Sequence, residues 1–480
     1  MSAHRLVQYT GNPHVDAGVA VLELRLKKPS DSFTEDDLRE QAAQLEAEYN
    51  RPIWKSYLTV HFPNSAWVQP RISAEKKRDY IEKVLSSYCF SPIVPAKACV
   101  FCSRPAQVVI DRSHFPLLTG ETVMVAGSGA EPGLAVCGFC IFAAQFYPLA
   151  TLKVGGRPLF WWAPEPAWTR LLTRRFREDV EKILAASSDQ FPNLRWQSTQ
   201  LMRAANNALR DWDKPPDWLS KQPRPPLCDI VGIHATNYGA GPNYDELRIP
   251  RSLLEFWSEA RSSFGALYQK IEDEAWENER KPRKSDKQSK PDSSPVPELE
   301  RRNNLYEALG DAFRSPEPGF EAKRIAARFF LRRKDKNVEP NTMALAEFFL
   351  EKVANMEKSR LEAIREIADN IADHLILSNR DRRAAEQLCR RRLKAGEFMQ
   401  CLSRIQRKLS DAGHPFMWDR VLLALGLASE EDRTAPDLWL VQELILIRLY
   451  EKLASSEILA ELPEPALEEF SEKQSNEMQN

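Results

Sequence analysis

Two Cys-x-x-Cys pairs constrain this chain more than any other feature of its sequence. Cys99 and Cys102 form one pair, Cys137 and Cys140 form the other, and the 34 residues 103–136 lie between them in a chain with eight cysteines. Each pair can bind a metal ion through a tight turn, and two such turns complete a four-sulfur shell around tetrahedral zinc. We therefore predict a structural Zn²⁺ site.

Two alternatives to zinc remain open, namely reduced thiols without a metal ion and a redox Cys-x-x-Cys motif. A redox motif normally opens a helix in a thioredoxin-like unit and is not doubled. A four-thiolate shell leaves no open coordination position, so the predicted zinc stabilises a fold and implies no catalysis.

Length, charge and hydropathy limit the classes of protein to which the chain can belong. Its 480 residues predict about two to four domains. The net charge of −1 gives no overall basic surface, so a site for a polyanion must come from local segregation of charge. No signal-peptide pattern and no long apolar run is visible. Thiol pairs without a signal peptide predict a reducing, cytoplasmic location and no membrane partner.

The segment 278–300 divides the chain into two different parts. It is rich in Lys, Ser and Pro, and its only large apolar residues are Val296 and Leu299, so we predict a flexible linker. Residues 1–277 are mixed, with a zinc-binding insertion at about 95–145, and residues 301–480 are almost wholly helical. The predicted fold class is α+β, with a zinc-stapled mixed N-terminal domain and a C-terminal all-α helical bundle.

Local patterns predict the elements of both parts. Thr34 and Asp37 open a helix over 34–49. Strands are predicted over 56–62, 106–110 and 121–126, and helices over 168–184 and 196–211. In the C-terminal part, apolar residues at helical spacing predict helices over 345–356, 361–375 and 438–449.

Basic residues gather in two places. Between Arg380 and Lys408, ten Lys/Arg against three acids give a local balance of +7, typical of a helix face that follows a phosphate backbone. The candidate contacts are Arg380, Arg383, Arg390, Arg391, Lys394, Arg404 and Arg407. A second set includes Arg174 and Arg175, interleaved with tryptophans that can stack on bases. The alternatives are a solvated helix face for the charges and a core position for the tryptophans.

Asp111 and His114 lie between the cysteine pairs and suggest a different function. Four structural cysteines that flank an Asp/His pair resemble a treble-clef nuclease of the HNH type, in which a histidine activates water beside a second metal ion. Here Asp111 and His114 are not adjacent, and no histidine or asparagine closely follows Cys140. His114 as a packing or hydrogen-bonding residue is the alternative.

Three further stretches carry a resemblance to a known family. They are the Gly-Asn-Pro turn at 9–18, the Pro-Asn turn at 62–67, and the Asn/Gly-rich loop and strand at 237–250. With the four-cysteine segment, they resemble the large subunit of type I, I-B-like CRISPR Cascade complexes, the Cas-eight family in its Cst-one-like branch. The resemblance covers roughly residues 5–265.

The resemblance implies a non-catalytic subunit that reads the protospacer-adjacent motif (PAM) and stabilises the R-loop while guide pairing reads the rest of the target. The implied partners are crRNA, double-stranded target DNA, the Cascade backbone and small subunits, and a helicase–nuclease or transposition proteins. Asparagine amides on rigid turns can read base edges, and the candidates are Asn12, Asn64, Asn237 and Asn243. The alternative is that each asparagine only holds its own turn.

In several members of that branch, the gene also yields the small subunit from an internal start. Met343 opens a helical stripe here, and a product from it would have 480 − 343 + 1 = 138 residues. Two other functions stay open: a zinc-dependent HNH-type endonuclease acting through Asp111 and His114, and a stand-alone zinc-containing DNA-binding regulator.

Overall fold

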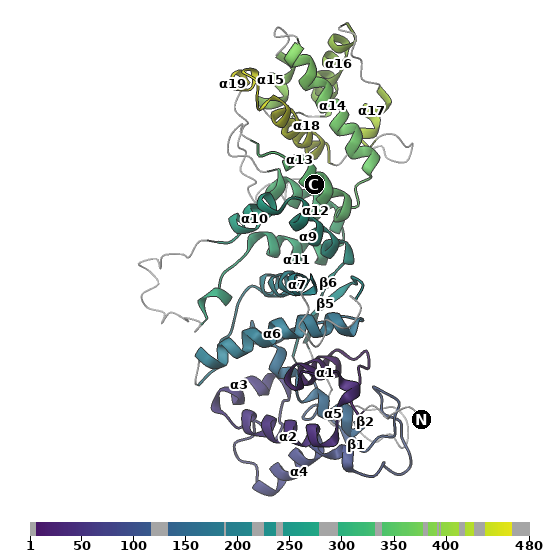
Figure 1. The fold of residues 1–480 in the computed structure, drawn as a ribbon, viewed down its shortest axis with the longest axis vertical. Coiled ribbons are helices and arrows are strands. Elements are labelled where there is room, and N and C mark those ends of the chain that lie inside the picture. Colours follow the sequence, from purple (N-terminus) through teal and green to yellow (C-terminus); the bar gives the residue numbers. More distant parts are fainter. Residues whose placement is uncertain are drawn as a thin grey trace. The chain divides into compact units, whose positions relative to one another are not determined.

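In the computed structural model, the chain forms two compact units. The structure describes residues 6–116, 133–186, 189–213, 225–236, 243–277, 296–331, 338–377, 383–390, 393, 395–411, 418–426 and 437–462. Unit 1 comprises residues 1–254 and 277–313, and unit 2 comprises residues 255–276 and 314–480 (Figure 1). The fold is mixed α and β, as predicted, with small sheets in unit 1.

Unit 1 begins with helices that start at the caps visible in the sequence. Asn12 caps α1 (Pro13–Leu26) by accepting from the backbone N–H groups of His14 and Val15. Thr34 and Asp37 form the predicted capping box of α2 (Glu35–Tyr49). The remaining elements of this part are η1 (Ser30–Ser32), α3 (Pro52–His61), α4 (Ala74–Leu85) and η2 (Ser87–Cys89).

The strand predicted over 56–62 is wrong, because this segment belongs to helix α3. Pro52 occupies the first turn, where its missing N–H costs nothing. The buried residues Ile53, Trp54, Tyr57, Leu58 and His61 recur at helical spacing on one face. The aromatic and β-branched composition favoured a strand, and packing of this face against the core overrides that preference.

Two antiparallel sheets follow. Strands β1 (Val108–Ile110) and β2 (Leu134–Val136) pair, which confirms part of the strand predicted over 106–110, whereas 121–126 lies outside the described residues. The second sheet has the order β3-β4-β5-β6. Its strands are β3 (Leu152–Val154), β4 (Arg157–Trp162), β5 (Ile230–Thr236) and β6 (Asn243–Ile249).

Helices cover both faces of the four-stranded sheet. The indole N–H of Trp161 donates to the carbonyl of Leu201 in α7 (Gln197–Asp213) at 2.9 Å. On the other face, the ring of His14 in α1 lies 5.3 Å from that of Phe160. Helix α7 and the neighbouring α6 (Pro166–Ala186) confirm the helices predicted over 196–211 and 168–184. Trp161 and Trp168 are buried, as the core alternative predicted.

The short helix α5 (Gly138–Ala144) connects the cysteine segment with α1. A Cβ atom on Gly18 would lie 1.8 Å from the carbonyl oxygen of Ala143, so only glycine permits this approach. Gln145, fully buried beyond the end of α5, accepts from the Tyr49 hydroxyl through its backbone and from the Trp67 indole through Oε1. The next element is η3 (Tyr147–Ala150).

The division of the chain differs from the predicted one at 277 and 301. Residues 296–313 belong to unit 1. They contain η5 (Pro297–Leu299), and α11 (Asn304–Arg314) follows it. Val296 and Leu299 are both buried. Gln200 of α7 donates to the carbonyl of Leu299 at 2.6 Å. Residues 278–295 of the predicted linker lie outside the described residues.

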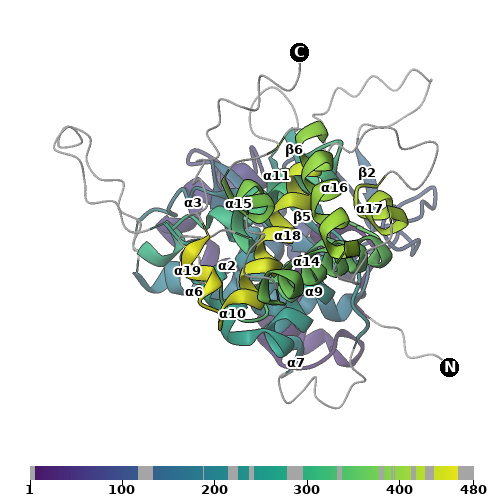
Figure 2. The same cartoon turned by 90° about the horizontal axis from the view of Figure 1, so that it is seen from above.

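The described part of unit 2 is helical. Helix α9 (Arg251–Ser263) contains the boundary between the units. The elements that follow it are α10 (Gly265–Glu274), α12 (Pro318–Ile325), η6 (Ala326–Phe330), α13 (Thr342–Lys352), α14 (Lys358–Leu377), α15 (Arg383–Arg390), α16 (Ala395–Asp411), α17 (Trp418–Ala424), α18 (Leu438–Leu453) and α19 (Ile458–Glu461). Figures 1 and 2 both show α14 beside α18, and these two helices carry two of the predicted apolar stripes.

Met343 lies in the first turn of α13, where it is buried and its N–H donates to Glu451 of α18 at 2.8 Å. Six residues later, the ring of Phe349 stacks on Phe330 at 4.6 Å and packs edge-on against Phe256 at 5.1 Å. A product that starts at Met343 would lack both partner rings, so Phe349 would have to pack against other residues to stay buried.

Across the part of the chain that the structure describes, no helix combines the length and apolar character needed to cross a bilayer.

The crossing of α1 and α5 gives a first prediction. Gly18→Ala forces the two backbones apart, because the new Cβ overlaps the Ala143 carbonyl. We expect unit 1 to lose about 3 kcal/mol of stability or more, measured by denaturant unfolding. Gly265→Ala is the control, because a Cβ there meets no atom within 4 Å. Equal unfolding midpoints for Gly18→Ala and the unchanged chain would contradict this crossing.

Two buried histidines predict that unit 1 loses stability in acid. Burial lowers the pKa values of His14 and His61 to about 3, against 6.5 in the unfolded chain. Their contribution is complete above pH 6.5 and is lost as the pH falls toward 3, because the unfolded chain then binds the protons. At pH 5 each histidine should cost about 2 kcal/mol.

The measurement is denaturant unfolding of the unchanged chain and His61→Gln at pH 7 and pH 5. The variant should be less stable at pH 7, because it disturbs the bond that Nδ1 of His61 donates to the Tyr57 carbonyl and the bond between Nε2 and the Thr151 hydroxyl. Its further loss between the two pH values should be smaller by about 2 kcal/mol. The same pH dependence in both proteins would show that His61 is not held neutral.

Candidate metal centre

The structure brings all four predicted cysteines together. The sulfur atoms of Cys99, Cys102, Cys137 and Cys140 lie within 4.8 Å of one another, and those of Cys102 and Cys137 are 3.4 Å apart. A tetrahedral ion with metal–sulfur bonds of about 2.3 Å needs sulfurs about 3.8 Å apart. The donor set therefore fits a metal ion, and four thiolates would fill its coordination shell.

Local structure holds each pair in position. In the first pair, the N–H of Cys99 donates to the carbonyl of Arg104 at 2.7 Å, and the carbonyl of Cys99 accepts from Ser103 at 2.9 Å. The left-handed conformation of Ser103, with φ of 62°, reverses the chain at this turn. In the second pair, Cys137 caps α5, and its sulfur accepts from the N–H of Cys140 at 3.4 Å. Both turns direct their sulfurs to one point.

Burial and charge favour a cation at that point. Three of the four cysteines are buried, and Cys102 is partly exposed. Hydrogen bonding from the Cys137 thiol lowers the pKa of Cys102 to about 7, and hydrogen bonds within the cluster raise the pKa of Cys140. Four thiolates this close repel one another strongly in a buried site, so full deprotonation requires a positive ion among them.

The centre also positions the chain before α1. Arg104, two residues after Cys102, donates to the carbonyl of Leu6 at 2.7 Å and to Oε1 of Gln8 at 2.9 Å. Its guanidinium lies 5.5 Å from the ring of Phe139, which stands between the second pair of cysteines. The segment that precedes α1 is thus tied to both cysteine turns.

Asp111 and His114 form a bonded pair beside the centre. His114 Nδ1 lies 2.7 Å from Asp111 Oδ1, and the His114 ring stacks on Tyr80. Burial acts to raise the pKa of Asp111, but hydrogen bonds from His114 and Ser113 lower it below its ordinary value. Among the described residues, the four cysteines are the one group of three or more His, Cys, Asp and Glu side chains placed to hold a metal ion.

The predicted asparagines divide between two places. The side-chain oxygen of Asn12 caps α1, as the turn-holding alternative predicted. Asn64 is exposed with φ of 64° at the end of α3, and Asn243 opens β6. The hydroxyl of Thr236, paired with Asn243, donates to the carbonyl of Val60 at 3.2 Å, so the end of α3 lies at the same end of the sheet as Asn243. Asn237 lies outside the described residues.

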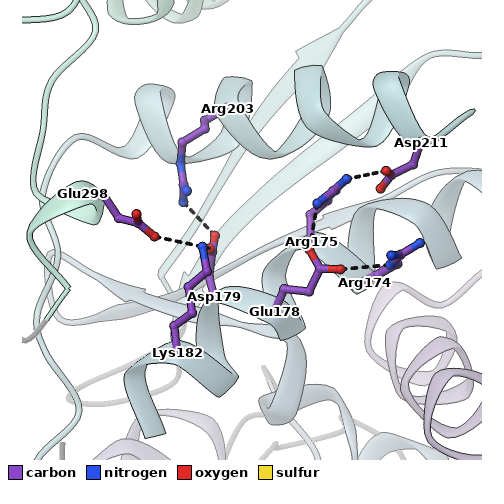
Figure 3. A network of polar contacts seen from close by, with 8 residues as sticks. All are labelled: Arg174, Arg175, Glu178, Asp179, Lys182, Arg203, Asp211 and Glu298. Carbon is purple, nitrogen blue, oxygen red and sulfur yellow. Dashed lines mark hydrogen bonds and ion pairs between the residues drawn. The ribbon is translucent and has the colours of Figure 1, made fainter. Parts of the chain in front are cut away.

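Arg174 and Arg175 are held by acids within unit 1. Figure 3 shows both arginines paired with Glu178 of the same helix, at 2.9 and 2.7 Å, and Arg175 paired also with Asp211 of α7. Nearby, Arg203 of α7 pairs with Asp179 of α6, and Lys182 pairs with Glu298 of the returning segment. Arg175 thus joins α6 to α7, and Arg174 has an acid partner in its own helix, while phosphate contact by either arginine stays a prediction.

Only part of the basic segment 380–408 can be placed. Arg404 and Arg407 are exposed one turn apart on α16, and Arg404 lies 3.5 Å from the side-chain oxygen of Gln387. Arg383 and Arg390 lie in α15, whose side chains at these positions are outside the described residues, as are Arg380, Arg391 and Lys394 entirely.

Sequence reasoning missed Arg157, which opens β4 at the end of the sheet that carries Asn243. Its guanidinium donates to Oδ1 of Asn243 at 2.6 Å. The available signal was a cation directly after Gly155 and Gly156, between two apolar runs.

In comparisons with known proteins, no family, curated protein or solved structure matches this chain.

The cluster predicts a firmly bound metal ion that stabilises unit 1. A closed thiolate site contributes on the order of 10 kcal/mol to the folding of small metal-bound modules. We expect one metal ion per chain by elemental analysis, and chelation or Cys137→Ser should remove it and open the segment 95–145 to protease. Cys89→Ser is the control, because this exposed cysteine is outside the cluster. Full stability after metal removal would contradict a structural role.

Proposed function

We propose that this chain is the large, non-catalytic subunit of a crRNA-guided type I Cascade complex, with Zn²⁺ at the four-cysteine centre. In this role it recognises the protospacer-adjacent motif and stabilises the R-loop. The observation that carries the proposal is the closed set of four thiols in a mixed α/β unit. It supports a metal ion that holds a fold, as the family resemblance implies, because no coordination position stays open for water.

Zinc is the ion that the donor set favours. Four thiolates in two Cys-x-x-Cys turns are one of the usual structural zinc shells, and zinc in structural sites is almost always tetrahedral. The adjoining contacts suit a permanent centre, because Cys137 caps α5 and Arg104 ties the segment before α1.

The end of the four-stranded sheet supports a DNA-facing role for unit 1. Arg157 and Asn243 lie there, and the end of α3 that leads to Asn64 adjoins it. These side chains come from three separate segments and are exposed or partly exposed. A rigid sheet that presents loop ends is a common way to build a binding surface.

The described part of α16 supports a role for unit 2 along a nucleic-acid strand. Gln400, Arg404 and Arg407 are exposed at helical spacing on one face, between Glu397 and Asp411 at its two ends. Cations on one face can follow successive phosphates and make binding sensitive to salt. The implied partners are the guide RNA, target DNA, the backbone and small subunits, and a helicase–nuclease or transposition machinery. A small subunit that starts at Met343 stays a prediction.

The proposal predicts the behaviour of the chain during purification. Co-expressed with the neighbouring backbone-subunit genes and a guide array, it should co-purify with guide RNA and those subunits. On its own it should hydrolyse neither plasmid nor linear DNA with Mg²⁺ or Mn²⁺, because the thiolate shell leaves no site for a reactive water. The measurements are RNA sequencing of the purified complex and gel analysis of the DNA.

One observation favours a second function, the HNH-type endonuclease. Asp111 is bonded to Nδ1 of His114, the arrangement that orients a histidine as a base. DNA cleavage by the isolated chain that disappears in His114→Ala, and persists in Cys89→Ser, would replace our proposal with this alternative. Tight binding of duplex without any RNA partner would instead indicate a stand-alone regulator.

A further inference from the structure

At the end of the four-stranded sheet where Gly155 and Gly156 form a turn, the side chains of Arg157 and Asn243 are joined by a hydrogen bond. This bond affects what the two side chains can bind. Arg157 is the first residue of β4 and Asn243 is the first residue of β6. One guanidinium N–H donates to Oδ1 of Asn243 at 2.6 Å. An arginine has only donors, so this contact also establishes which end of the Asn243 amide faces Arg157.

The pair offers N–H donors and a positive charge, and Arg157 uses one of the two lone pairs on its single acceptor atom, Oδ1 of Asn243. The guanidinium has five N–H groups and uses one of them on Asn243. With one lone pair of Oδ1 used by Arg157, the Asn243 amide presents two N–H donors and one remaining lone pair to a ligand. Bidentate reading of adenine in the major groove requires one donor and one acceptor from the amide. Arg157 already uses one lone pair of that acceptor, so the pair as a whole presents more donors than acceptors.

An acid at this end of the sheet, Asp245, lies two residues after Asn243 on β6, and its carboxylate accepts from the side chain of Gln197 at 3.0 Å. Among the described residues, no carboxylate lies within ion-pair distance of Arg157, nor of Lys153 or Arg195, which lie on the adjoining segments. Leu194 joins those segments by donating to the carbonyl of Lys153 at 2.8 Å. By contrast, Arg248 of β6 is paired with Glu246 at 3.0 Å, and Arg174, Arg175 and Arg203 all have acid partners.

The turn beside the pair leaves room for a ligand. Gly155 and Gly156 connect β3 to β4 with φ of 54° and 80°, and a Cβ atom at either position would meet no atom within 4 Å. The N–H of Gly156 donates to the side chain of Asn193 at 2.6 Å, which holds the turn. No side chain projects from these two positions toward an approaching sugar–phosphate backbone.

We propose that Arg157 and Asn243 together bind a phosphodiester group of a nucleic-acid backbone and read no base. A phosphate has only acceptor oxygens and a negative charge, so it complements a site made of donors and cations. The inference rests on the proposed function for the presence of nucleic acid, and it changes the expected role of Asn243 from reading the motif to positioning the strand.

The test measures binding of the full chain by fluorescence anisotropy to short labelled duplex DNA of two unrelated sequences, and to single-stranded RNA, from about 50 to 200 mM KCl. Arg157→Gln should weaken binding about tenfold at the lowest salt, equally for both sequences. The slope of log K against log salt should become shallower by about 0.9 for duplex or about 0.7 for a single strand.

Asn243→Asp is the second variant, because it keeps the acceptor for Arg157 but removes both amide donors and cancels the charge. It should weaken binding as much as Arg157→Gln does while the thermal midpoint is kept. Arg248→Gln is the matched control, because that exposed arginine of the same strand already has an acid partner. The stronger-binding arm, duplex DNA or RNA, identifies the source of the phosphate.

The outcomes separate this inference from the proposed function. An unchanged salt slope in Arg157→Gln, or weakening confined to one DNA sequence, overturns the phosphate site even if the chain still co-purifies with guide RNA. Absence of binding by the unchanged chain at the lowest salt overturns it as well. A shallower slope in a chain that joins no guide complex retains the phosphate site and refutes the Cascade assignment.

Discussion

The convergence of four sulfur atoms is the constraint on which much of unit 1 depends. Because Cys137 is both a member of the cluster and the cap of α5, closing the cluster also determines where α5 begins. Helix α5 then approaches α1 so closely that only Gly18 fits at the crossing. Beyond the other end of α5, Gln145 joins Tyr49 and Trp67 through buried hydrogen bonds. A metal ion here would therefore stabilise contacts well outside its own ligands.

Electrostatics divides the cations of unit 1 into two groups with different uses. Arg175 and Arg203 pair with acids across α6 and α7 and hold the two helices together, and Arg174 pairs with Glu178 of its own helix. Charges neutralised in this way contribute little field outside the molecule. Arg157 has no acid partner among the described residues and faces an open turn. Counting charges along the sequence cannot separate these groups, because the acids that neutralise an arginine are often distant in the chain. A surface for nucleic acid is better sought where cations stay unpaired.

Much of the local structure could be predicted, and the errors have identifiable causes. Thr34 and Asp37 predicted the start of α2 correctly, because a capping box involves residues only three apart. The segment 56–62 was predicted as a strand because aromatic and β-branched residues suit strands, yet its buried residues recur at helical spacing from Ile53 onward. The predicted boundary between the two parts was misplaced, because residues 296–313 pack on helix α7. These residues lie about a hundred positions further along the chain, so no local pattern indicates the contact.

By itself, the sequence determined the four ligands of the candidate metal centre and most helices, because both depend on residues within a few positions of one another. Tertiary structure alone decided that Arg175 and Arg203 are neutralised by acids of a neighbouring helix, that residues 296–313 cover α7, and that Arg157 holds Asn243 across 86 residues. These outcomes depend on hydrogen bonds and ion pairs between distant segments. Such contacts form only after burial brings the segments together, and no local pattern records them.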